Sequence, residues 1–139
     1  MQAQNKNTLI MQLQLTGTYI VLCYGKKAYK KYCKKRFNLF SDFQHLGVST
    51  EFLNTNTISY EIVIGIGKSN DVYNVKSTTV HELSHAVSQW MEYFGFNCDE
   101  VRSYTLQMIY KDTMIFLDRI LLEQQIKKED KENKAQEDR

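Results

Sequence analysis

The chain has 139 residues, of which 42% are hydrophobic and 24% are charged, which is typical of one compact globular domain and too short for two comfortable ones. The formal net charge is only +2, so no global field indicates binding to nucleic acid or to a membrane surface. The three cysteines show no CxxC spacing, and the chain has neither a signal-peptide pattern nor a long apolar run, so we expect a soluble intracellular protein without disulfides.

The first half of the chain predicts strands on either side of one helix. Apolar and polar residues alternate over 11–16, which indicates a half-buried strand, and the apolar run 19–24 predicts a second strand after a break. Apolar residues recur at helical spacing between the lysines of 26–37, which predicts a short amphipathic helix. Residues 38–57 show no clear period and are interpreted as a loop. The segment 58–67 then alternates strongly and predicts a strand.

The second half predicts two long helices. The first covers about 71–94 and ends at Gly95, and the second covers about 98–124. The charged residues 125–139 are interpreted as a fraying helix end or a disordered tail. We therefore predict an α+β fold for a single domain, 1–124, in which a small mixed sheet packs on the first long helix.

The sequence "HELSH" carries the strongest chemical signal. His81 and His85 are four residues apart on the first long helix, so both imidazoles lie on one face and can bind one zinc ion. Glu82 is next to the first histidine, where its carboxylate can act as the general base on an attacking water. The alternative is a capping box, in which Thr79 is the N-cap of a helix and the Glu82 side chain accepts a hydrogen bond from the Thr79 backbone N–H.

A third zinc ligand has to come from elsewhere in the chain. His45 is predicted to lie in a loop as an ordinary surface or packing residue. Glu92 is about 10 Å past His85 along the helix and is out of reach. The second helix supplies the remaining candidates, which are Cys98, Asp99, Glu100 and Asp112.

Glu100 is the predicted third ligand, and it can reach the metal only if the two long helices are arranged in a particular way. A strictly antiparallel second helix reaches the level of His85 only near Gln107, so Glu100 requires a steep crossing or a bent first helix. The competing interpretation is again a capping box, with Asn97 as the N-cap.

The basic segment 26–37 and two tyrosines of the second helix each have a functional interpretation and an ordinary structural one. Seven of the twelve residues in 26–37 are basic, which is compatible with a nucleic-acid patch, but a solvated helix face is favoured, and nucleic acid is not an expected partner. Tyr104 and Tyr110 on the second helix are able to donate a hydrogen bond to an oxyanion, with Tyr104 the predicted catalytic residue. Tyrosines at such positions more often pack with the hydroxyl at a rim.

The stretch "TVHELSHAVSQWMEYFGFNCDEVRSYTLQMIY" resembles the short zincin-type metallopeptidase-like proteins encoded by tailed bacteriophages and prophages. The matching positions after the motif are Gly95, Glu100, Ser103 and Tyr104, and "TYIVLCYG" and "YEIVIGIG" resemble the strands that precede the metal helix. The likeness covers roughly 18–112. The loop after Gly95 is short, and Ser103 stands where alanine is more usual.

The resemblance implies a minimal zincin-like fold with one zinc ion on His81, His85 and Glu100, and with the strand 58–67 bordering the cleft. The implied function is a zinc metallopeptidase that pairs an extended peptide with that strand, with a phage structural protein as one candidate substrate. The alternative is an inert zinc-binding structural or interaction module of a phage particle. The expected location is the host cytoplasm or the virion, with no membrane association.

Overall fold

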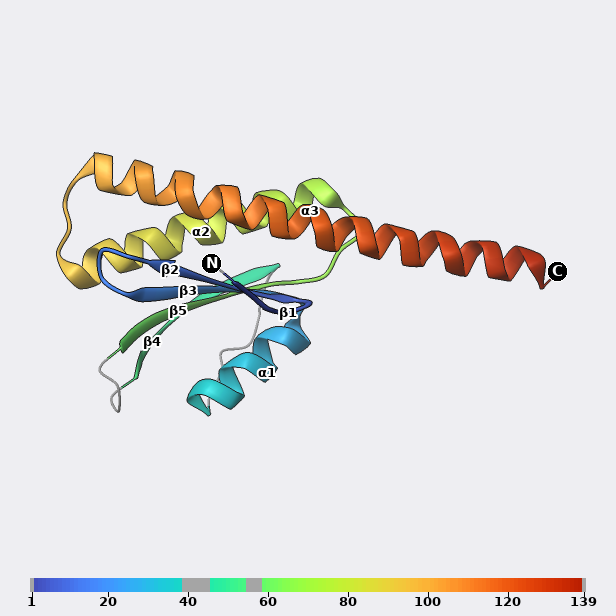
Figure 1. Ribbon diagram of the computed structural model, residues 1–139, viewed down its shortest axis with the longest axis horizontal. Coiled ribbons are helices and arrows are strands. Elements are labelled where there is room, and N and C mark those ends of the chain that lie inside the picture. The colour runs from blue at the N-terminus through green and yellow to red at the C-terminus, as the bar shows by residue number, and fades with distance from the viewer. Residues whose placement is uncertain (1, 39–45, 55–58, 139) are drawn as a thin grey trace.

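The computed structural model of the chain describes residues 2–38, 46–54 and 59–138. Its centre is a five-stranded sheet with the strand order β1-β2-β3-β5-β4, and three helices pack on it (Figure 1). The strands are β1 (Gln2–Asn5), β2 (Thr8–Leu13), β3 (Thr18–Tyr24), β4 (Gly47–Asn54) and β5 (Ser59–Ile66). The helices are α1 (Lys26–Phe37), α2 (Val72–Phe94) and α3 (Asp99–Glu137). The predicted α+β class is confirmed.

The sheet is mixed because its central pair is parallel. β2 and β3 form an antiparallel hairpin that turns at Gly17, whose φ of 72° lies in the left-handed region. β3 and β5 run parallel and are connected through α1 and β4. β4 pairs antiparallel with β5 and is the last strand of the sheet.

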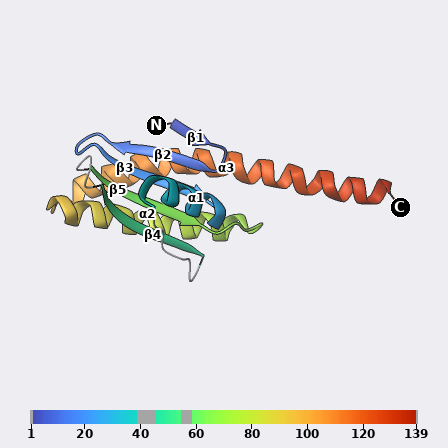
Figure 2. The ribbon, with the colours of Figure 1, turned by 90° about the horizontal axis from the view of Figure 1, so that it is seen from below.

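The sheet separates two hydrophobic layers. α2 and α3 cover one face, while α1 lies on the other face over β3 and β5 (Figures 1 and 2). The alternation predicted for β5 is confirmed, because Tyr60, Ile62, Ile64 and Ile66 pack toward α2 and α3, while Val63 packs toward α1. Ile58, the first residue of that predicted alternation, lies outside the described residues.

The edge of the sheet differs from the prediction. The loop predicted over 38–57 contains β4, so that prediction is wrong for Gly47–Asn54. The strand 58–67, predicted to border the cleft, is paired on both sides, and β4 takes the edge position instead. The reason is that β4 carries polar side chains on one face, and its strand conformation depends on hydrogen bonds to β5 that local sequence does not show.

The helix α2 begins and ends with clear signals. The side chain of Asp71 caps α2 by accepting from the Asn74 amide at 3.1 Å, and Gly95 ends it with a φ of 74°. Thr79 lies inside α2 and donates to the Val75 carbonyl at 2.7 Å, so the motif is not a capping box.

α3 starts without the predicted cap and is longer than predicted. Its N-cap is Cys98, which makes no side-chain capping bond, so the capping box from Asn97 to Glu100 is not formed. The helix continues past Gln124 to Glu137, and this C-terminal part projects beyond the sheet (Figure 1). No helix in the described part of the chain is long and apolar enough to span a membrane.

Candidate metal centre

His81 and His85 point their imidazole rings at one another on the exposed side of α2. Their Nε2 atoms are 3.1 Å apart, and the ring planes are almost perpendicular at 83°. Two zinc–nitrogen bonds of 2.0–2.1 Å at a tetrahedral angle place their nitrogens about 3.3 Å apart. The separation also suits a hydrogen bond between two neutral rings, in which one Nε2–H donates to the other ring. The pair therefore fits two of the positions around a zinc ion.

Glu82 differs from the two histidines because it is almost buried. Its side chain is 8% exposed, and its Cγ lies against Gly47, where an added Cβ would approach to 3.1 Å. The same added atom would come within 3.0 Å of Thr78 on α2. A residue without a side chain at position 47 therefore allows the start of β4 to approach the motif.

The remainder of β4 keeps this edge of the sheet beside α2. Ser49 Oγ donates to Gln89 Oε1 at 2.9 Å, one turn beyond His85. On the other face of the strand, Phe52 is buried against α1. The sequence does contain a weak signal for this strand, because Val48, Thr50 and Phe52 alternate with more polar neighbours.

α2 and α3 run side by side in opposite directions (Figure 1). Arg102 donates two hydrogen bonds to the hydroxyl of Ser88, at 2.6 and 3.0 Å. Closer to the motif, Gln107 and Ser84 line the same small hollow. The expectation that α3 reaches the level of His85 near Gln107 is therefore confirmed.

This register leaves Glu100 away from the histidines. Glu100 is exposed in the first turn of α3, seven residues before Gln107 and so about 10 Å along the axis. Among the described residues, no three His, Cys, Asp or Glu side chains come close enough together to bind one metal ion. The structure thus brings together His81 and His85, and it leaves Glu100 separate, as it does the alternatives Cys98, Asp99 and Asp112. His45 lies outside the described residues.

The two tyrosines predicted near the site occupy different faces of α3. Tyr104 is 67% exposed on the face turned away from the core. Tyr110 lines the hollow that also contains Ser84, the residue just before His85. Of the two, Tyr110 is the one whose position approaches the motif.

A second feature is a basic groove beside α1, with a volume of about 850 Å³. Its cationic lining residues are Lys6, Lys27, Lys31, Lys35, Arg36 and Lys68, and no carboxylate of the described part of the chain lines it. Arg36 is paired with the fully buried Glu61 at 2.5 Å, and Lys6 lies 3.7 Å from Glu123. The other four lysines form no ion pair with a described residue.

Positive charges lie close together beside this groove. The contact of Lys127 with Lys6, through a hydrogen bond and the repulsion of two ammonium groups, lowers the pKa of Lys127. Lys68 crosses the start of α1, because its Cε would lie 2.9 Å from a Cβ at Gly25. The sequence alone shows the lysines of α1. It does not show that Lys6 and Lys68 lie beside them in the same groove.

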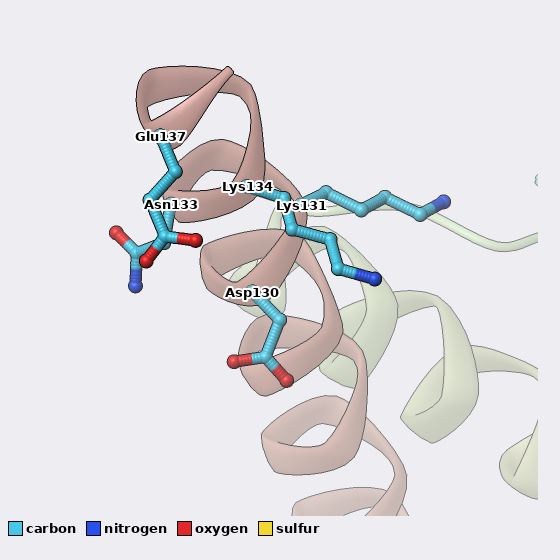
Figure 3. A pocket seen from close by; sticks show the side chains of 5 residues that line it. All are labelled: Asp130, Lys131, Asn133, Lys134 and Glu137. Atoms are coloured by element: carbon cyan, nitrogen blue, oxygen red, sulfur yellow. The ribbon is translucent and has the colours of Figure 1, made fainter.

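A third hollow, of about 410 Å³, lies near the end of α3 (Figure 3). The residues that line it come from the last turns of this one helix: Asp130, Lys131, Asn133, Lys134 and Glu137. All of them except Asn133 are charged, and both signs occur. A single helix offers no opposing wall, so this hollow is a gap between solvated side chains.

No known protein family, no curated protein and no solved structure matches the chain. The resemblance to phage zincin-type proteins thus depends on the quoted residues alone.

Proposed function

We propose that the chain is a zinc-dependent hydrolase that cleaves peptide bonds, with His81 and His85 as metal ligands and Glu82 as the general base. The observation that carries the proposal is the 3.1 Å separation of two exposed Nε2 atoms next to a nearly buried carboxylate. A zinc ion held there would supply Lewis acidity and lower the pKa of a bound water toward 7. Glu82 would accept the proton of the attacking water and deliver it to the leaving amine.

The open edge of β4 supports a peptide as the substrate. Among the residues that the structure describes, β4 pairs with β5 on one side and has no partner on the other, so the backbone N–H and C=O groups of that side are able to pair with an extended chain. Gly47 at its start lies against Glu82, which would place a paired peptide next to the proposed base. In the zincin-like fold that we propose, β4 has the role that the resemblance to zincin-type proteins implies for 58–67.

The zinc content of the purified protein tests the ligand assignment. We expect about one zinc ion per wild-type chain, and almost none in His81→Ala or His85→Ala, because a single remaining imidazole cannot hold the ion. Inductively coupled plasma mass spectrometry after dialysis measures the ratio. His45→Ala is the matched control, since it removes the one histidine outside the motif and should leave the zinc content unchanged.

The variant Glu100→Ala tests the ligand that the structure leaves separate. Loss of zinc in this variant would mean that α3 changes its position when the metal binds. Retention of zinc would exclude Glu100 as the third ligand. Zinc in neither the wild type nor any variant would contradict the proposal, whereas bound zinc without turnover would support the inert module instead.

The basic groove favours a second candidate function, the binding of a nucleic-acid strand. Lys27, Lys31 and Lys35 follow one another at intervals of about 6 Å along α1, and Lys68 adds a fourth unpaired charge. Tyr32 lies among them and offers an aromatic ring, as in grooves that bind single strands. These features support a binding groove in addition to the solvated helix face expected from the sequence.

Salt dependence separates this function from weak, general attraction. Four lysine–phosphate contacts predict a loss of affinity of about 50-fold between 50 and 200 mM salt, measured by fluorescence anisotropy with a labelled single strand. Lys31→Glu should weaken binding by at least about tenfold. Lys34→Glu makes the same charge change on α1 outside the groove, and equal effects of the two variants would rule out the groove as the binding site.

A further inference from the structure

α3 has two apolar faces, and only one of them packs on the protein. Its buried residues are Thr105, Ile109, Thr113, Phe116, Leu117, Ile120 and Leu121. A second set is exposed: Tyr104 (67%), Met108 (49%), Ile115 (59%), Leu122 (60%) and Ile126 (49%). At 100° per residue the exposed set falls within about 40° on the helix, roughly 150° from the centre of the buried face. We call these five residues the outer stripe.

The outer stripe is too regular to be a scatter of exposed residues. Met108, Ile115 and Leu122 are each seven residues apart, which is the repeat of a helix that packs along another helix. From Tyr104 to Ile126 the stripe extends about 33 Å. Single exposed apolar residues are ordinary on protein surfaces, but a continuous row of this length indicates an interface.

The spacing of the outer stripe is symmetric about its centre. The intervals from Tyr104 to Ile126 are four, seven, seven and four residues, so the order is the same in both directions from Ile115. An antiparallel second copy of the stripe would place Tyr104 opposite Ile126, Met108 opposite Leu122, and Ile115 opposite itself. Such self-complementarity is what a two-fold symmetric interface requires.

The charges that flank the stripe fit the same arrangement. Lys111 and Asp118 lie on one side of it, and Asp112 and Arg119 lie on the other. In an antiparallel pair each flank meets the same flank of the second copy. Lys111 then faces Asp118 of the second copy, and Asp112 faces Arg119, so opposite charges meet on both sides. Within its own chain Asp118 also pairs with Lys76 at 2.7 Å, and Arg119 donates to the Lys6 carbonyl at 3.2 Å.

We propose that the chain forms an antiparallel dimer in which the outer stripe of α3 packs against the outer stripe of a second copy, about a two-fold axis at Ile115. The partner is a second copy of this chain, because both the spacing of the stripe and its flanking charges are complementary to the same stripe running in the opposite direction. The interface does not include the histidine pair, so the dimer forms whether or not zinc binds.

Sedimentation equilibrium of the full chain tests the dimer. We expect a dimer for the wild type, and for Ile115→Glu a dissociation constant raised at least about 30-fold, because two carboxylates then meet at the centre of the interface. The control is Leu15→Glu, which changes a leucine in the β2–β3 turn that is somewhat more exposed (67%) than Ile115 (59%) and should leave the dimer intact. Far-ultraviolet circular dichroism checks that both variants keep their helices. A monomeric wild type, or an unchanged dissociation constant for Ile115→Glu, overturns the proposal.

Disulfide cross-linking tests the orientation. In a Cys98→Ser background, Ile115→Cys should cross-link two copies on mild oxidation, because that position meets itself on the axis. Tyr104→Cys alone should not cross-link, whereas Tyr104→Cys combined with Ile126→Cys should. Cross-linking through Tyr104→Cys alone would indicate a parallel pair and overturn the antiparallel arrangement.

Discussion

Replacing Glu82 with glutamine is expected to lower kcat/KM by about 10²–10⁴-fold while the protein keeps its zinc. Glutamine fills the same volume against Gly47, so β4 and α2 should stay in contact. It cannot take a proton from the attacking water, and the proposed mechanism loses its base. The measurement is cleavage of a mixed peptide library followed by mass spectrometry, with kcat/KM determined on the best substrate.

The matched control for this experiment is Glu92→Gln. Glu92 is on the same helix and exposed, and it lies about 10 Å beyond His85, so its loss should leave kcat/KM within experimental error of the wild type. Full activity of Glu82→Gln would show that another group takes the proton. Loss of zinc in Glu82→Gln would instead show that the carboxylate binds or positions the metal.

The elements that sequence predicted well are those whose signals are local. The bounds of α2 follow from the Asp71 cap and from Gly95, and the face of β5 follows from its alternation. The histidine pair was predictable for the same reason, since the rise of the helix alone brings positions 81 and 85 together.

The features that sequence missed depend on pairing between distant segments. β4 is a strand because β5 offers it hydrogen-bonding partners, and its own alternation is weakened by the polar Thr50 on the apolar face and by Leu53 on the polar face. The basic groove likewise forms because Lys6 and Lys68 fold against α1. A short window of sequence contains only a weak signal for β4, and it shows only the α1 lysines of the groove.

Glu100 shows how a local motif and a global constraint can disagree. The resemblance assigns it to the metal, while the antiparallel packing of α2 and α3 carries it to the far end of α2. The helix arithmetic already indicated Gln107 as the residue level with the motif, and the contact between Arg102 and Ser88 supports that register. A third ligand from the start of α3 would therefore need a rearrangement of α3, which the zinc content of Glu100→Ala detects.

Truncation of Trp90 is expected to have the largest effect on stability, because this side chain joins α2 to the sheet. It is 1% exposed, its ring lies 5.1 Å from that of Phe96, and its Nε1 donates to Thr16 Oγ1 at 2.8 Å. Trp90→Ala should lower the free energy of unfolding by about 3–5 kcal/mol, through lost burial and the cavity left behind. Urea unfolding followed by circular dichroism measures it, since the variant removes the chain's single tryptophan.

A second substitution at this position separates packing from hydrogen bonding. Trp90→Phe retains most of the apolar contact and loses the hydrogen bond to Thr16. The missing bond should lower the free energy of unfolding by about 1 kcal/mol, and the smaller ring should lower it further. A change within about 0.5 kcal/mol for Trp90→Ala would contradict the core position assigned to the ring.

Trp90 and the histidine pair lie on opposite sides of α2, so Trp90→Ala should still bind one zinc ion at temperatures where it is folded. Loss of zinc at such temperatures would mean that the metal site depends on how tightly α2 packs on the sheet.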